Sequence, residues 1–121
     1  MKISTLGHTW LIDIDGTIVE HNGYLNGEDK LLPGVKEFWN EIPKQDFIIL
    51  LTARPQEHWK RTLDFLKSQG LRFDHAIFNL PTGERILIND TKPSGLDTAI
   101  GINIERNIGL ENLKINLDKD L

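Results

Sequence analysis

The sequence predicts an α/β fold built on a mostly parallel sheet. Short apolar runs, each long enough for a buried strand, alternate with segments whose apolar residues recur at helical spacing. Three of these runs end abruptly in polar residues, as strands that carry a site at one sheet edge do. The length of 121 residues fits one domain, residues 1–121, with no room for a second lobe.

The composition excludes several classes of protein. With 39% hydrophobic and 26% charged residues, the chain is expected to fold. A net charge of −4 and the lack of a Lys/Arg run do not predict nucleic-acid binding, although a nucleotide remains a candidate substrate. The absence of cysteine excludes disulfides and thiolate chemistry and favours the cytoplasm. No stretch approaches the length of a membrane span, so we expect a soluble protein without a membrane partner.

The first half of the chain predicts a strand, a loop, a helix and a strand. The apolar run Thr9–Ile14 is the first strand, and the polar, glycine-bearing stretch Thr17–Leu32 is a loop or small flap. Pro33 and Gly34 open a helix that continues to about residue 41. Its apolar residues fall at i, i+3, i+4 and i+7 and form one face: Val35, Phe38, Trp39 and Ile42. The continuous apolar run Phe47–Leu51 is the second strand.

The second half predicts one helix and three strands. The helix covers about Gln56–Gln69 and ends at Gly70. The predicted strands are Phe73–Phe78, Arg85–Ile88 and Ala99–Ile104, followed by a tail with few apolar residues. The first two of these strands are too close in sequence for a parallel crossover, which needs about a dozen residues. They are therefore expected to form a short hairpin near the last polar motif, which makes the sheet mixed.

Two aspartates at the end of the first strand are the leading candidates for a functional site. Residues i and i+2 of a strand face the same side, so Asp13 and Asp15 are expected to lie together, and Gly16 permits a sharp turn after them. Two close carboxylates repel unless a cation or a proton relieves them. An Asx-type turn is the structural alternative. A calcium loop would need an acid at its twelfth position, where Tyr24 stands.

Two further strands end in polar residues. Thr52 follows the second strand, and Asn89 and Asp90 follow the strand Arg85–Ile88. The carboxyl ends of parallel strands share one edge of the sheet, so these groups are expected to converge with the aspartates. Acidic oxygens and a hydroxyl at one edge are ligands that Mg²⁺ prefers.

These three motifs resemble those of the haloacid-dehalogenase-like hydrolase superfamily. The matching residues are Asp13-Ile14-Asp15-Gly16-Thr17 after an apolar strand, Thr52 after Ile48–Leu51, and Asp90 after Ile86–Ile88. The resemblance covers the whole chain in the right order. It implies a Rossmann-like three-layer fold without a cap domain, and Mg²⁺-dependent phosphoryl transfer through an aspartyl-phosphate.

The resemblance also implies a role for each matching residue. Asp13 would be the nucleophile and a metal ligand. Asp15 would act as general acid and then base and give the metal its backbone carbonyl. Thr52 would hold the phosphoryl oxygens, while Asp90, with the neutral Asn89 beside it, would complete the metal shell.

The chain departs from the superfamily at the lysine that normally lies between the second and third matching motifs. The corresponding stretch is Asn79-Leu80-Pro81, so Arg85 or Lys92 would have to supply the positive charge. Lys92 is well placed, two residues past the last motif. Ala53 and Arg54, directly after the second motif, are the further candidates for substrate binding together with Arg85, although Arg54 could instead cap its own loop.

The predicted function is Mg²⁺-dependent hydrolysis of a phosphomonoester such as a phosphorylated sugar, a nucleotide or another small metabolite. Two alternatives remain: a phosphotransferase of a polysaccharide pathway, or a non-catalytic domain that serves in binding or assembly. Without a cap the site is expected to be open, and a second copy of the chain could cover it. In the flap, His21 and Tyr24 are candidate substrate contacts.

Overall fold

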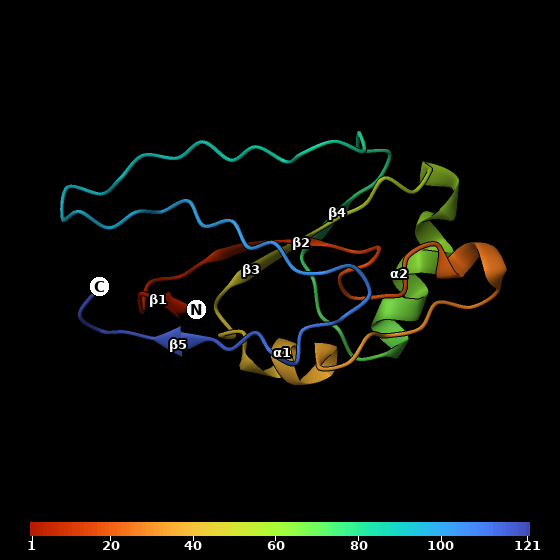
Figure 1. Cartoon of the computed structure of the whole chain (residues 1–121), viewed down its shortest axis with the longest axis horizontal. Coiled ribbons are helices and arrows are strands. Elements are labelled where there is room, and N and C mark those ends of the chain that lie inside the picture. Colours follow the sequence, from red (N-terminus) through yellow and green to blue (C-terminus); the bar gives the residue numbers. More distant parts are fainter.

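A three-stranded parallel sheet and two helices form the body of the molecule in the computed structural model, which describes residues 1–121 (Figure 1). The elements in chain order are β1 (Lys2–Ile3), β2 (Thr9–Asp13), the 3₁₀ helix η1 (Gly23–Asn26), α1 (Val35–Glu41), β3 (Phe47–Leu51), the 3₁₀ helix η2 (Gln56–His58), α2 (Trp59–Ser68), β4 (His75–Ile77) and β5 (Asn116–Leu117). The strands and helices of the first 78 residues thus confirm the sequence prediction.

The sheet has the strand order β2-β3-β4 with all neighbours parallel. Thr9 of β2 lies opposite Phe47 of β3, and the register continues to Asp13 opposite Leu51. The central strand β3 is a continuous apolar run because it is buried between two neighbours, and Ile48 and Leu50 are fully inaccessible. This register brings the carboxyl ends of β2 and β3 to the same edge, where the polar motifs begin.

The two helices cover one face of this sheet. They connect successive parallel strands in one direction, and right-handed crossovers place such helices on the same side. Their buried residues, among them Phe38 and Leu66, belong to one core cluster with Ile48. On the other face Leu11 and Phe47 remain 47% and 46% exposed. A mixed α/β fold with parallel strands is confirmed, whereas a three-layer arrangement is not seen.

Residues 81–104 form an extended arm without helix or strand, which leaves the body and returns to it (Figure 1). The predicted strands Arg85–Ile88 and Ala99–Ile104, and the hairpin with β4, are therefore wrong. Outside the turn at its tip, the backbone of the arm makes no hydrogen bond to other backbone groups. Apolar composition suggested strands here, but a strand also needs a partner, and Ile86 and Ile88 stay 83% and 90% exposed.

The C-terminal tail docks on the chain's own N-terminal part. β5 pairs in parallel with β1, and the N-terminal ammonium of Met1 donates to the carbonyl of Lys114 at 2.8 Å. Further back, the N–H of Leu110 donates to the carbonyl of Pro33 at 2.8 Å, just before α1. The preceding Gly109 has φ +88, and a Cβ at this position would collide with the backbone of Pro33. The crossing of the two segments therefore requires glycine.

We expect Gly109→Ala to lower the free energy of unfolding by about 1–3 kcal/mol, since it adds left-handed strain and a backbone collision. Urea denaturation measures the change. Gly101→Ala is the matched control, because an added Cβ there meets no atom within 4 Å and its φ lies outside the left-handed region. Equal stability of the two variants would contradict the proposed role of this crossing.

Candidate functional site

The acid loop, residues 13–17, begins where β2 ends. The N–H of Ile14 still bonds the carbonyl of Leu51 at 2.9 Å, which ties the loop to β3. The N–H groups of Ile18 and Val19 then turn back to the carbonyl of Ile14. Gly16, at φ +82, makes this turn, and a Cβ there would lie 3.1 Å from Cγ of Arg106. The sequence correctly indicated a turn that needs glycine.

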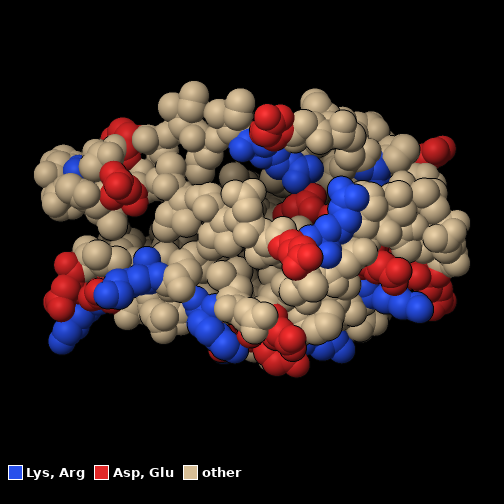
Figure 2. All heavy atoms as spheres, in the orientation of Figure 1, with Lys and Arg blue, Asp and Glu red and all other residues tan.

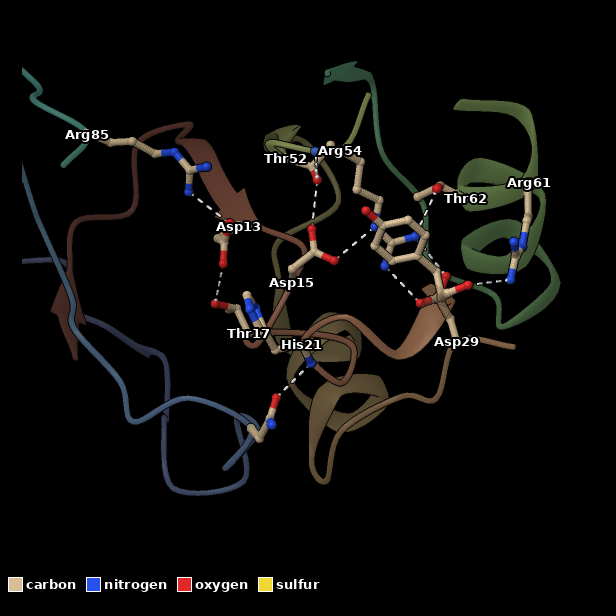
Figure 3. Close-up of polar contacts among 12 residues, drawn as sticks. Asp13, Asp15, Thr17, His21, Asp29, Thr52, Arg54, Arg61, Thr62 and Arg85 are labelled. Atoms are coloured by element: carbon tan, nitrogen blue, oxygen red, sulfur yellow. Dashed lines mark hydrogen bonds and ion pairs between the residues drawn. The ribbon is translucent and has the colours of Figure 1, made fainter. Parts of the chain in front are cut away.

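Asp13 is held by two side chains and remains accessible (Figure 3). The hydroxyl of Thr17 donates to Asp13 Oδ2 at 2.9 Å, and Arg85 Nη1 donates to Asp13 Oδ1 at 2.8 Å. The side chains of Asp13 and Arg85 are 32% and 38% exposed. Arg85, at the beginning of the arm, therefore supplies the positive charge that the sequence assigned to either Arg85 or Lys92.

Asp15 is bound by protein groups on both carboxylate oxygens. The Thr52 hydroxyl donates to Oδ2 at 2.7 Å, and Arg54 Nε donates to Oδ1 at 2.9 Å (Figure 3). Thr52 is fully buried, and its oxygen accepts the N–H of Arg54 at 3.0 Å. The hydroxyl proton is thus committed to Asp15. In this structure Thr52 positions Asp15 and is not free to hold a phosphoryl group, in contrast to the role predicted from the resemblance.

Arg54 is a buried connector rather than a substrate-binding residue. It is 3% exposed and makes a bidentate ion pair with Asp29 of the flap, at 2.9 Å from Nη1 and 2.8 Å from Nη2. Nη1 also donates to the hydroxyl of Thr62 on α2 at 2.9 Å. The Tyr24 ring stacks on the guanidinium with 4.0 Å between Cζ and the ring centroid. All donors point into the protein, so the prediction for Arg54 was wrong.

The charge of Arg54 is stabilised by its two acidic partners. Burial lowers the pKa of Arg54, but the hydrogen bonds and charges of Asp29 and Asp15 outweigh this effect and raise it above the ordinary value. The guanidinium therefore stays charged at every pH at which the protein would be studied. It joins the acid loop, the flap and α2 into one buried polar network. Ala53, between Thr52 and Arg54, is exposed and has no polar group to contribute.

The remaining predicted site residues lie on the arm. Asn89, Asp90 and Lys92 are exposed near the turn at its tip. The N–H of Lys92 bonds the carbonyl of Leu96 at 2.9 Å, and the Thr98 hydroxyl donates to the carbonyl of Asp90 at 2.5 Å. None of these residues forms a hydrogen bond or ion pair with the acid loop.

The predicted magnesium ligands are not assembled. No group of three or more His, Cys, Asp or Glu side chains comes together in a way that could hold a metal ion. Asp13 faces Arg85 and Asp15 faces Arg54, while Asn89 and Asp90 lie on the arm. The four residues do not fit a magnesium shell in this arrangement, and arginine side chains supply the positive charge beside both aspartates.

Several residues around the acid loop lacked a clear sequence signal. The backbone N–H of His21 donates to Asn107 Oδ1 at 2.8 Å, and the N–H of Asn107 donates to the carbonyl of Gly16 at 2.9 Å. The end of the arm is thereby fixed against both the loop and the flap. The sequence marked residues 105–107 only as a polar cluster, because contacts over such a separation leave no local pattern. Asp29, the partner of Arg54, was likewise one polar flap residue among several.

The surface gives little further indication of a partner. On the face in Figure 2, acidic and basic side chains are interspersed and no continuous basic patch is seen. Two hollows lie along α1, and their linings, which include Phe38, Leu110 and Leu32, contain no residue of the acid loop. No helix of the structure combines the length and the apolar character needed to cross a membrane.

Comparison of the chain with protein-family models, with curated proteins and with solved structures finds no match.

Proposed function

We propose that this chain is a phosphomonoester hydrolase of the haloacid-dehalogenase-like type, in which Asp13 attacks phosphorus and forms an aspartyl-phosphate. One observation carries the proposal: Asp13, at the carboxyl end of β2, is accessible, oriented by Thr17 and paired with the cation of Arg85. The order of the three motifs along the chain supports it. The Rossmann-like three-layer fold without a cap is part of the same proposal.

The chemistry of the acid loop suits this reaction. A carboxylate attacks a dianionic phosphate slowly unless positive charge compensates the developing charge. Arg85 provides a guanidinium within hydrogen-bond distance of Asp13. The backbone N–H of Asp15 donates to no protein group, so it is available to a phosphoryl oxygen. A magnesium requirement remains proposed on sequence grounds, and the residues described so far act without it.

The proposed substrate is a small phosphorylated metabolite such as a sugar phosphate or a nucleotide. The acid loop is open enough to leave a third of the Asp13 side chain exposed, which suits a small ester reaching it from solvent. A non-catalytic binding or assembly domain is the second candidate. The observation that favours it is the pairing of both aspartates with arginines in the absence of an assembled metal shell.

Phosphate release from a panel of phosphomonoesters tests the proposal. Sugar phosphates, nucleoside monophosphates and p-nitrophenyl phosphate are supplied with Mg²⁺ and, in parallel, with a chelator. Release of phosphate from at least one ester supports the hydrolase, and its loss in chelator supports the metal requirement. Capture of the phosphoryl group by added alcohols would indicate a transferase. No release from any ester under either condition would contradict the proposal and favour the binding domain.

A further inference from the structure

His21 stands out because its Nδ1 is the buried side-chain nitrogen or oxygen that has no hydrogen-bond partner. Such orphaned groups are rare and often belong to sites that bind or react. The residue lies in the flap against the acid loop, since a Cβ on Gly16 would be 3.7 Å from Cβ of His21. In Figure 3 its ring points from the flap toward the side chains of Asp13 and Asp15.

The position of His21 is fixed independently of its ring. Its N–H donates to Asn107 Oδ1 at 2.8 Å, and Asn107 is itself anchored on the carbonyl of Gly16 at 2.9 Å. The flap that carries it is tied to β3 by the ion pair of Asp29 with Arg54 at 2.8 Å. The backbone is therefore held at both sides while Nδ1 stays free for a ligand.

Asp15, the other candidate for proton transfer, is poorly arranged for it. Both of its oxygens accept hydrogen bonds, from Thr52 at 2.7 Å and from Arg54 at 2.9 Å. Each donor is buried and directed at the carboxylate, so a proton on either oxygen would displace one of these bonds. The permanent charge of Arg54 also favours the ionised form. Asp15 in this geometry is an acceptor that holds the loop, not a ready proton donor.

We propose that His21 is the general acid and base of the reaction, a role that rests on the proposed function. In the first step a carboxylate oxygen of Asp13 forms a bond to phosphorus. The bond from phosphorus to the ester oxygen breaks, and that oxygen takes the proton of His21 Nδ1 and leaves as the alcohol. In the second step neutral His21 takes a proton from water, whose oxygen attacks phosphorus. The bond to Asp13 breaks, and phosphate, the carboxylate and the protonated imidazole result.

Dependence on the leaving group tests this assignment. An alkyl phosphate such as glycerol phosphate needs a proton on its leaving oxygen, whereas p-nitrophenolate leaves without one. His21→Gln keeps a polar side chain but cannot transfer a proton, so we expect kcat on the alkyl ester to fall about 10²–10⁴-fold. The formation of the phosphoenzyme from p-nitrophenyl phosphate should fall less than about tenfold, because that step needs no proton donor. His75→Gln, an exposed histidine of β4, is the control and should retain both activities.

Chemical rescue adds an independent readout. His21→Gly with added imidazole should recover hydrolysis of the alkyl ester, and the same addition should not help Asp13→Asn. Equal losses on both esters in His21→Gln, or no rescue in a folded His21→Gly, would overturn the assignment. A loss confined to alkyl esters in Asp15→Asn, with His21→Gln unaffected, would return the role to Asp15. If the wild type hydrolyses no ester, the proposed function itself has failed.

Discussion

Asp13→Asn is expected to lower phosphate release by about a thousandfold or more, because the amide cannot form the bond to phosphorus that the first step requires. The substitution is nearly isosteric, so Thr17 and Arg85 keep a neighbour of the same shape. The measurement is kcat on the best ester of the panel, with unfolding curves recorded in parallel. We expect the two proteins to unfold at similar denaturant concentrations.

Asp64→Asn provides the matched control for this substitution. Asp64 lies on the exposed side of α2, where it pairs with Lys60 at 2.8 Å. Its replacement changes the net charge by the same amount without touching the acid loop. Activity should be unchanged in Asp64→Asn. If Asp13→Asn retained more than about a tenth of the wild-type rate, Asp13 would not be the nucleophile.

Arg54→Met is expected to lower the free energy of unfolding by about 3–5 kcal/mol, the usual cost of leaving buried charges without their partner. Asp29 is 7% exposed and loses its bidentate partner, and Asp15 loses one of its two donors. The flap should also become more mobile, which hydrogen exchange at residues 22–30 would detect. Lys60→Met, which removes an exposed cation from α2, is the control and should leave the unfolding midpoint nearly unchanged.

A double variant separates charge from packing in this network. In Arg54→Met/Asp29→Leu neither charged partner of the bidentate pair remains, so part of the lost stability should return. A fully additive loss would mean that the contacts of Arg54 with Tyr24 and Thr62 matter more than its pairing.

The effect of Arg54 should not depend on pH in the neutral and alkaline range. Because its pKa is raised, the stability from its charge is fully present below the pKa of the unfolded chain. It is lost only when the pH rises through the still higher folded-state value. The difference in stability between wild type and Arg54→Met should therefore stay constant from about pH 7 to pH 9. A marked decrease of the difference over this range would contradict the ion-pair explanation.

Local patterns were sufficient to predict the body of the fold. The continuous apolar run of β3 and the helical spacing of α1 each reflect burial against one face, which sequence periodicity reports directly. The arm was mispredicted for the converse reason. Residues 85–88 are as apolar as a strand, but pairing depends on a neighbour that the local sequence does not specify. The exposure of Ile86 and Ile88 shows that composition alone did not bury them.

The candidate site was predictable where chemistry and local geometry coincide. Asp13 and Asp15 at a strand end, followed by Gly16, could be recognised because their spacing fixes their direction. The pairing of Arg54 with Asp29 could not, since a surface loop and a buried cation look alike in composition. His21 was recognised only as a polar flap residue. Its position against Gly16 depends on Asn107, a contact across 86 positions of the chain.

The most direct test of the central claim is detection of a phosphoryl group on Asp13. The enzyme is mixed with its ester, quenched in acid within milliseconds, digested and analysed by mass spectrometry. The expected result is one phosphoryl group on the peptide that contains Asp13, sensitive to hydroxylamine as an acyl phosphate is, and absent from Asp13→Asn. Rapid phosphate release without any phosphorylated peptide, or with the phosphoryl group on another residue, would contradict nucleophilic attack by Asp13.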